Sequence, residues 1–167
     1  MRACSLVLVS LLVCAAQPSA NEPEWPGIYL HNQVTKHAVY SALAGASVWL
    51  KKPECRGVFA EFSDQSGVPL DQKLARLSVD EVKYLRTILF RDGSNLRPCK
   101  RAGTVMFTTP GSKLVFVCER QLIEQFRVDR VVLNALVIHE ALHTLGLGEN
   151  PPTTFYITNR VKARCWR

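Results

Sequence analysis

After its first twenty residues the sequence contains no apolar run long enough to cross a bilayer, and it contains no internal repeat and no linker. These absences argue against a membrane-spanning mature chain and against a chain of several domains. Of the 167 residues, 47% are hydrophobic and 21% are charged, which is the composition of an ordinary globular protein. Length and composition together favour one domain and exclude a collagen-like fibre or a low-complexity scaffold.

The first twenty residues predict a secretory signal peptide. Arg2 supplies a short positive segment, residues 5–16 form an apolar core, and residues 16–20 form an exit rich in small side chains. We therefore expect a secreted or periplasmic protein with a single domain over residues 21–167. Without residues 1–20, Lys and Arg number 20 against 14 Asp and Glu. A surplus of this size favours solubility and gives at most a weak preference for anionic partners.

The cysteines lack C-x-x-C spacing, which argues against a cysteine-bound structural zinc. Four of the six lie beyond the signal peptide, and an even number in an exported chain predicts two disulfides. Cys99 and Cys118 flank an expected hairpin and are a plausible pair, with Cys55 and Cys165 as the remainder. Four cysteines allow three pairings, and the sequence leaves the pairing open.

Hydrophobic periodicity predicts an α+β fold with helices packed around a small antiparallel sheet or hairpin. The expected helices cover residues 35–52, 69–77, 119–127, 130–145 and 155–165. Two alternating apolar segments, residues 104–108 and 113–117, flank a turn that contains Pro and Gly and predict the hairpin.

Two further local predictions concern the middle of the chain. Residues 58–62 have the composition of a short strand. Ser78 and Glu81 have the spacing of a capping box, so we expect a helix to begin there and to end at Asp92 and Gly93.

The pattern most informative about chemistry is His139-Glu140-Ala141-Leu142-His143, an H-E-x-x-H sequence inside the expected helix over residues 130–145. Side chains four residues apart share one face of a helix, so both imidazoles can bind the same metal ion. Glu140 lies one position further along, where it can polarise a metal-bound water and carry the proton to a leaving group. The pattern predicts metal-dependent hydrolysis.

Residues 131–150 resemble the zincin metalloproteases, and their extended form is similar to the metzincin motif H-E-x-x-H-x-x-G-x-x-H. Gly146 matches the position at which the chain turns, and Glu149 stands at the position of the third ligand. Zinc accepts a glutamate oxygen as well as an imidazole nitrogen. The resemblance therefore implies Zn²⁺ bound by His139, His143 and Glu149.

Other features depart from the metzincin pattern or compete with this ligand set. The only methionine after position 1, Met106, precedes the motif, so a Met-turn is missing, and the sequence ends 18 residues after Glu149. His31 and His37 are competing candidates for the third ligand. Tyr156 is a candidate donor to a transition-state oxyanion, as tyrosines are in some zincins.

The resemblance implies a zinc-dependent metallopeptidase that acts outside the cytoplasm, with zinc-bound water as nucleophile and Glu140 as general base. Zincins bind peptide along an edge strand, and residues 113–118 are the expected strand. Two alternatives remain open: a zinc-dependent amidase of cell-wall or other amides, and a non-catalytic, disulfide-stabilised binding module. The basic residues are dispersed, which argues against nucleic acid as a partner. We expect a monomer that acts on peptides or proteins.

Overall fold

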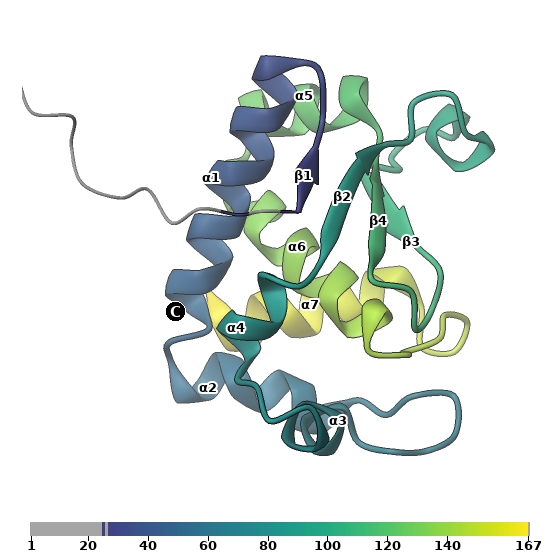
Figure 1. Ribbon diagram of the computed structural model, residues 1–167. Helices are drawn as coiled ribbons and strands as arrows, with labels where there is room; N and C mark the ends of the chain where they lie inside the picture. Colours follow the sequence, from purple (N-terminus) through teal and green to yellow (C-terminus); the bar gives the residue numbers. More distant parts are fainter. Residues whose placement is uncertain (1–24, 26, 167) are drawn as a thin grey trace, which may run out of the picture.

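The computed structural model describes Trp25 and residues 27–166. The predicted signal peptide lies outside the described residues. Within them the chain forms helices around one small sheet, which confirms the predicted α+β class (Figure 1).

The sheet is mixed rather than antiparallel, and four short strands form it. In spatial order these are β1 (Ile28–Tyr29), β2 (Leu89–Asp92), β4 (Leu114–Val117) and β3 (Met106–Thr108). The antiparallel pair β3 and β4 confirms the predicted hairpin, whereas β1 with β2 and β2 with β4 are parallel pairs. Because β4 has a neighbour on each side, β3 is the edge strand on this side of the sheet.

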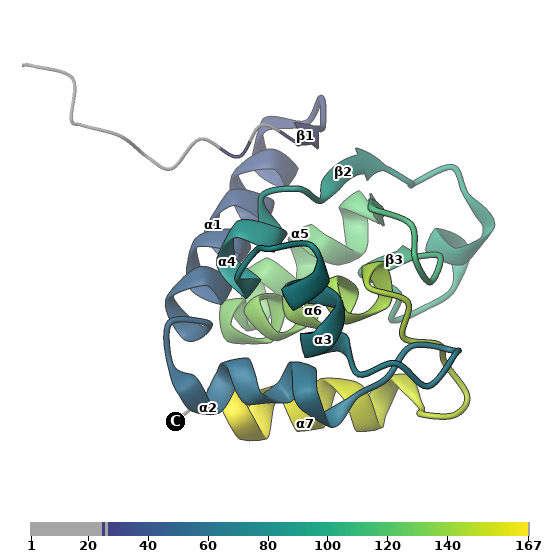
Figure 2. The ribbon, with the colours of Figure 1, turned by 60° about the horizontal axis from the view of Figure 1, so that its bottom comes forward.

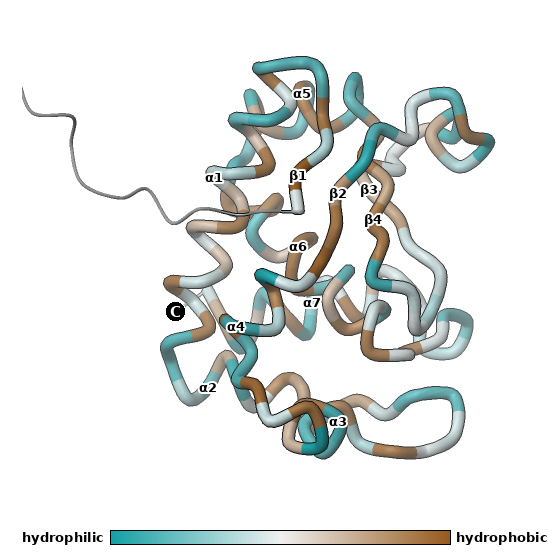
Figure 3. Tube along the Cα trace, viewed as in Figure 1, coloured by the Kyte–Doolittle hydropathy of each residue, from teal (hydrophilic) through white to brown (hydrophobic). Residues whose placement is uncertain are grey.

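Helix α6 (Arg130–Thr144) is central to the core. It contacts α1 (Gln33–Trp49), α5 (Glu119–Val128), α7 (Thr154–Cys165) and strand β3. Hydrophobic residues run along α6, β2 and β4 where these elements face the interior (Figure 3). The chain thereby places α6 between the sheet and the other long helices, with one of its ends against β3.

Several short helices connect α1 to strand β2 (Figure 2). Helix α2 (Pro53–Arg56) and the 3₁₀ segment η1 (Gly57–Glu61) contact α7, α3 (Leu70–Arg76) contacts η1, and α4 (Glu81–Leu85) contacts α1. The predicted strand over residues 58–62 is therefore wrong. Val58 and Phe59 are adjacent and both fully buried, which a helical turn allows and a strand with one exposed face does not.

The capping box predicted at Ser78 is also wrong. Ser78 has a positive φ of 55°, and the helix cap is Asp80, whose side chain accepts a hydrogen bond from the Lys83 backbone N–H at 2.7 Å. The helix then ends at Leu85 rather than at Asp92. Residues 89–92 instead pair on both sides as strand β2, so sheet formation outweighs their helical periodicity.

Two disulfides connect the periphery to this frame. Cys55–Cys165 joins α2 to the end of α7, and Cys99–Cys118 joins a 3₁₀ turn (Arg97–Lys100) to the end of β4. This is one of the three pairings that the sequence left open, and it is compatible with an extracellular setting. Among the described residues, the helices are too short or too polar to cross a membrane.

Candidate metal centre and active site

The candidate site is built on the C-terminal half of α6. Asp129 caps the helix start by accepting hydrogen bonds from the Val131 and Val132 backbone N–H groups at 2.9 and 3.3 Å. At the other end Gly146 adopts a φ of 110° and its N–H donates to the His143 carbonyl oxygen at 2.8 Å. A Cβ on Gly146 would lie 3.0 Å from the Asp64 side chain, so only glycine suits this turn. The chain then doubles back and brings Glu149 to the helix face that carries both histidines.

Three side chains of this segment meet at one point. The Nε2 atoms of His139 and His143 are 2.9 Å apart, and Glu149 Oε1 lies 3.6 Å from the first and 3.3 Å from the second. Both histidines are buried, whereas Glu149 is partly exposed. The group His139, His143 and Glu149 could hold a metal ion, and within the described part of the chain no fourth His, Cys, Asp or Glu belongs to it.

The spacing of these three atoms fits a tetrahedral ion. Ligand atoms about 2.0–2.1 Å from a tetrahedral Zn²⁺ lie about 3.3 Å from one another. The three measured separations, 2.9, 3.3 and 3.6 Å, are distributed around that value. Two imidazole nitrogens and one carboxylate oxygen are also a donor set that zinc accepts, and three protein ligands leave one tetrahedral position for water or substrate.

Hydrogen bonds on the far side of each ring orient the imidazoles. His143 Nδ1 lies 2.7 Å from the Leu147 carbonyl oxygen, which can only accept. The Nδ1 atom therefore carries the proton, and Nε2 presents a lone pair to the centre of the group. His139 Nδ1 lies 2.9 Å from the Thr158 hydroxyl on α7, and burial lowers the pKa of His139. Both effects favour the neutral imidazole that binds metals.

Glu149 is held ionised. The contact with His139 lowers the pKa of Glu149 most, and with the hydrogen bond from the Thr154 hydroxyl it brings this pKa to about 2 despite partial burial. The Thr154 hydroxyl donates to Glu149 Oε1 at 2.5 Å. Thr154 begins α7, so the same helix positions one ligand through Thr154 and another through Thr158.

Glu140 is a buried carboxyl group of the site that lacks a partner. Its side chain is buried, and its Oε2 atom has no hydrogen-bond partner. Burial, with a further contribution from the Glu149 charge, raises the pKa of Glu140 to about 8. A carboxyl group with a pKa near neutrality, facing a cavity and free of other partners, is suited to exchange protons with a bound molecule.

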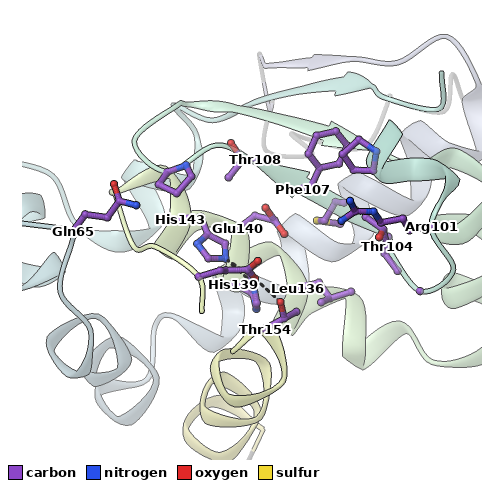
Figure 4. A pocket seen from close by; sticks show the side chains of 16 residues that line it. Gln65, Arg101, Thr104, Phe107, Thr108, Leu136, His139, Glu140, His143 and Thr154 are labelled. Carbon is purple, nitrogen blue, oxygen red and sulfur yellow. Dashed lines mark hydrogen bonds and ion pairs between the residues drawn. The ribbon is translucent and has the colours of Figure 1, made fainter. Parts of the chain in front are cut away.

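A pocket of about 560 Å³ opens over these residues (Figure 4). Helix α6 contributes Leu136 and the three motif residues, and strand β3 covers them from the other side. Figure 4 shows Gln65 at one end of the labelled set and Arg101 at the other, with Glu140 between them. The labelled lining residues therefore extend from Gln65 on one side of Glu140 to Arg101 on the other, and these two sides differ in charge.

Several residues singled out from the sequence lie elsewhere. His31 and His37 are exposed and are not part of the three-residue group, and the His37 ring packs edge-on against Phe126. Tyr156 does not line the pocket; its ring contacts Phe62. The expectation that residues 113–118 provide the edge strand is wrong, because β4 is paired on both sides. The edge strand beside the site is β3, the other half of the hairpin.

No family model, curated protein or solved structure matches this chain. The geometry and the side chains of the site are therefore the basis for assigning its chemistry.

Four further contributors to the site were not predicted from the sequence. Thr158 and the Leu147 carbonyl orient the imidazoles, while Gln65 and Arg101 line the ends of the pocket. Leu147 follows the motif closely and could have been inferred from the turn at Gly146. The other three reach the site only through tertiary packing.

Proposed function

We propose that this protein is a zinc-dependent peptidase of the zincin type that acts outside the cytoplasm. The single observation that carries the proposal is the combination of a three-ligand group with an unpartnered buried carboxyl group, Glu140, in one pocket. A metal site with a purely structural role has no use for a buried carboxyl group left without a partner, which is unfavourable for folding.

A bound Zn²⁺ would supply Lewis acidity and would make water a stronger acid at neutral pH. The chain itself supplies the proton transfers. Glu140 accepts a proton from the attacking water as the water oxygen bonds to the peptide carbonyl carbon. Glu140 then gives that proton to the amide nitrogen as the carbon–nitrogen bond breaks, so the products are a carboxylic acid and an amine. At neutral pH the acid passes its proton to the amine, which leaves a carboxylate and an ammonium group.

Strand β3 supports a peptide as the substrate. It is an edge strand of three residues, Met106–Thr108, and its residues line the same pocket as Glu140. An extended peptide can add to such an edge through backbone hydrogen bonds, which brings a peptide carbonyl over α6. This placement favours peptide hydrolysis over the amidase reading of the same metal site.

The test is cleavage of a mixed peptide library by the purified, oxidised protein loaded with zinc. We expect cleavage that a chelator abolishes and added zinc restores. Glu140→Gln should lose the activity, whereas Glu124→Gln, an exposed carboxylate on α5, is the matched control and should keep it. Metal-independent cleavage, or full activity of Glu140→Gln, would overturn the proposal.

A further inference from the structure

One charged side chain in the pocket has no part in the proposed metal binding or proton transfer. Arg101 lines the pocket and is exposed to it, at the end opposite Gln65 (Figure 4). Among the residues that the structure describes, no carboxylate forms an ion pair with it. The other lysine and arginine side chains of the described chain lie outside the pocket lining.

The backbone under Arg101 is fixed. Its N–H donates to the Pro98 carbonyl oxygen at 3.0 Å, and the Cys99–Cys118 disulfide ties the preceding turn to the end of β4. The Gln121 side-chain amide also donates to the Cys99 carbonyl oxygen at 2.6 Å. A loop fastened at these points fixes the backbone position from which the Arg101 side chain reaches the pocket, which reduces the ordering that binding would require.

Arg101 sets the sign of the charge away from the metal-binding group. Apart from His139, His143, Glu149 and Glu140, the only ionisable side chain in the pocket lining is Arg101, and its charge is positive. Beside it, Leu136 and Phe107 provide apolar surface that the methylene groups of a long acidic side chain can cover.

We propose that the Arg101 end of the pocket binds a carboxylate of the substrate, so that the enzyme prefers peptides with an acidic group on one side of the cleaved bond. The inference rests on the proposed peptidase function and specifies its substrate class. A guanidinium and a carboxylate match in shape and form two parallel hydrogen bonds. The carboxylate comes either from a Glu or Asp side chain or from the C-terminus of the peptide.

The experiment compares matched peptides that differ only by Glu, Gln or Lys at each position near the cleaved bond. A second set has a free or an amidated C-terminus. We expect the wild type to favour one carboxylate over its neutral counterpart by about tenfold in kcat/KM, the scale of a partly exposed charged hydrogen bond. Preference for Glu in amidated peptides identifies a side chain as the source, and preference for the free terminus identifies the C-terminal carboxylate.

Arg101→Gln should remove this preference, and Arg101→Glu should shift it toward Lys. Lys100→Glu is the control, because it changes charge by the same amount one residue away and Lys100 does not line the pocket. An Arg101→Glu protein with the wild-type profile, or a Lys100→Glu protein with the same altered profile as Arg101→Glu, would overturn the inference.

A binding measurement separates this inference from the proposed function. Zinc-loaded Glu140→Gln and its Arg101→Glu double variant are titrated with the same peptides by fluorescence anisotropy. Carboxylate-selective binding that Arg101→Glu abolishes supports the inference, whether or not the wild type cleaves these peptides. If the wild type binds the peptides in this way but cleaves none of them, the proposed peptidase function is contradicted and the inference is not. Cleavage without any carboxylate preference contradicts the inference alone.

Discussion

At the scale of single residues, the two imidazoles of the candidate metal site depend on partners outside the three-residue group. The Leu147 carbonyl fixes the tautomer of His143. The Thr158 hydroxyl orients the ring of His139, and it belongs to a helix that begins after the motif ends. Hydrogen bonds of this kind raise the basicity of the imidazole and reduce its rotational freedom.

Thr158 can be tested without reference to activity. Thr158→Val keeps the shape of the side chain and removes the hydroxyl, so we expect zinc affinity to fall by about 10- to 100-fold. Competition with a chromophoric chelator measures this affinity, and Thr158→Ser should restore most of it. Equal zinc affinity of Thr158→Val and wild type, at equal folding stability, would show that the hydroxyl does not position His139.

The sequence could predict His139, Glu140 and His143 because their spacing on one helix is enough to bring them together. Glu149 was predicted from the extended motif, and the positive φ at Gly146 explains why the chain returns to the helix there. Thr158 could not be predicted, since no fixed spacing relates it to His139 across an irregular loop. Arg101 could not be predicted for the same reason.

At the scale of secondary structure, the helices were more predictable than the strands. Helices α1 and α6 have apolar periodicity over 17 and 15 residues, which is long enough to be recognised. Strands β1 and β2 have two and four residues, and β2 lies inside a segment whose spacing is also helical. Strands β1 and β2 form because they pair with segments distant in the sequence. The local sequence of each strand does not indicate this pairing.

The turn after α6 gives a prediction at this scale. Gly146→Ala forces a side chain into a φ of 110° and places Cβ 3.0 Å from Asp64, so we expect a loss of about 1–3 kcal/mol in the free energy of unfolding. Gly57→Ala is the control, because a Cβ at Gly57 meets no atom within 4 Å and its φ is −55°. Urea denaturation measures both, and equal stabilities would contradict the need for glycine at this turn.

The contact between η1 and α7 predicts a pH dependence of stability. Burial acts to raise the pKa of Glu61, but the hydrogen bonds from Arg160 and Arg164 outweigh it, so the pKa lies below the ordinary value of 4.5. A carboxylate whose pKa is lower in the folded state stabilises the fold above its unfolded pKa. This contribution is lost as the pH falls through the folded pKa.

We therefore expect the stability advantage of the wild type over Glu61→Gln to be present above about pH 5 and to shrink as the pH falls below about 4. Thermal unfolding across this range measures the difference. The control is Glu54→Gln, which changes an exposed carboxylate on the neighbouring α2. The stability difference between the wild type and Glu54→Gln should vary little over the same pH range. A Glu61→Gln protein whose stability follows the wild type at every pH would contradict the ion-pair account.

At the scale of the whole molecule, the two disulfides constrain very different lengths of chain. Cys55–Cys165 spans 110 residues and Cys99–Cys118 spans 19. On the chain-entropy model these loops correspond to about 5 and about 3 kcal/mol of stabilisation. The first bond also anchors α7, the helix that carries both Thr154 and Thr158.

Replacing Cys55 and Cys165 together by alanine should therefore lower the free energy of unfolding more than replacing Cys99 and Cys118. Denaturant unfolding of the two double variants, each with the other disulfide intact, gives this comparison. The variant without Cys55–Cys165 should also bind zinc more weakly, because α7 is less firmly held against α6. A larger loss from the Cys99–Cys118 pair would contradict this ranking.

The central claim is that Glu149 binds the metal and Glu140 transfers the proton. The most direct test measures zinc affinity and hydrolysis rate on the same variants of these two residues. Glu140→Gln should bind one equivalent of zinc as tightly as the wild type and lose about 10²–10⁴ in turnover, the contribution of a general base. Glu149→Ala should bind zinc more weakly, and Glu149→His should retain it by restoring a third nitrogen ligand. Zinc binding by Glu149→Ala as tight as that of the wild type, together with undiminished turnover by Glu140→Gln, would contradict the account.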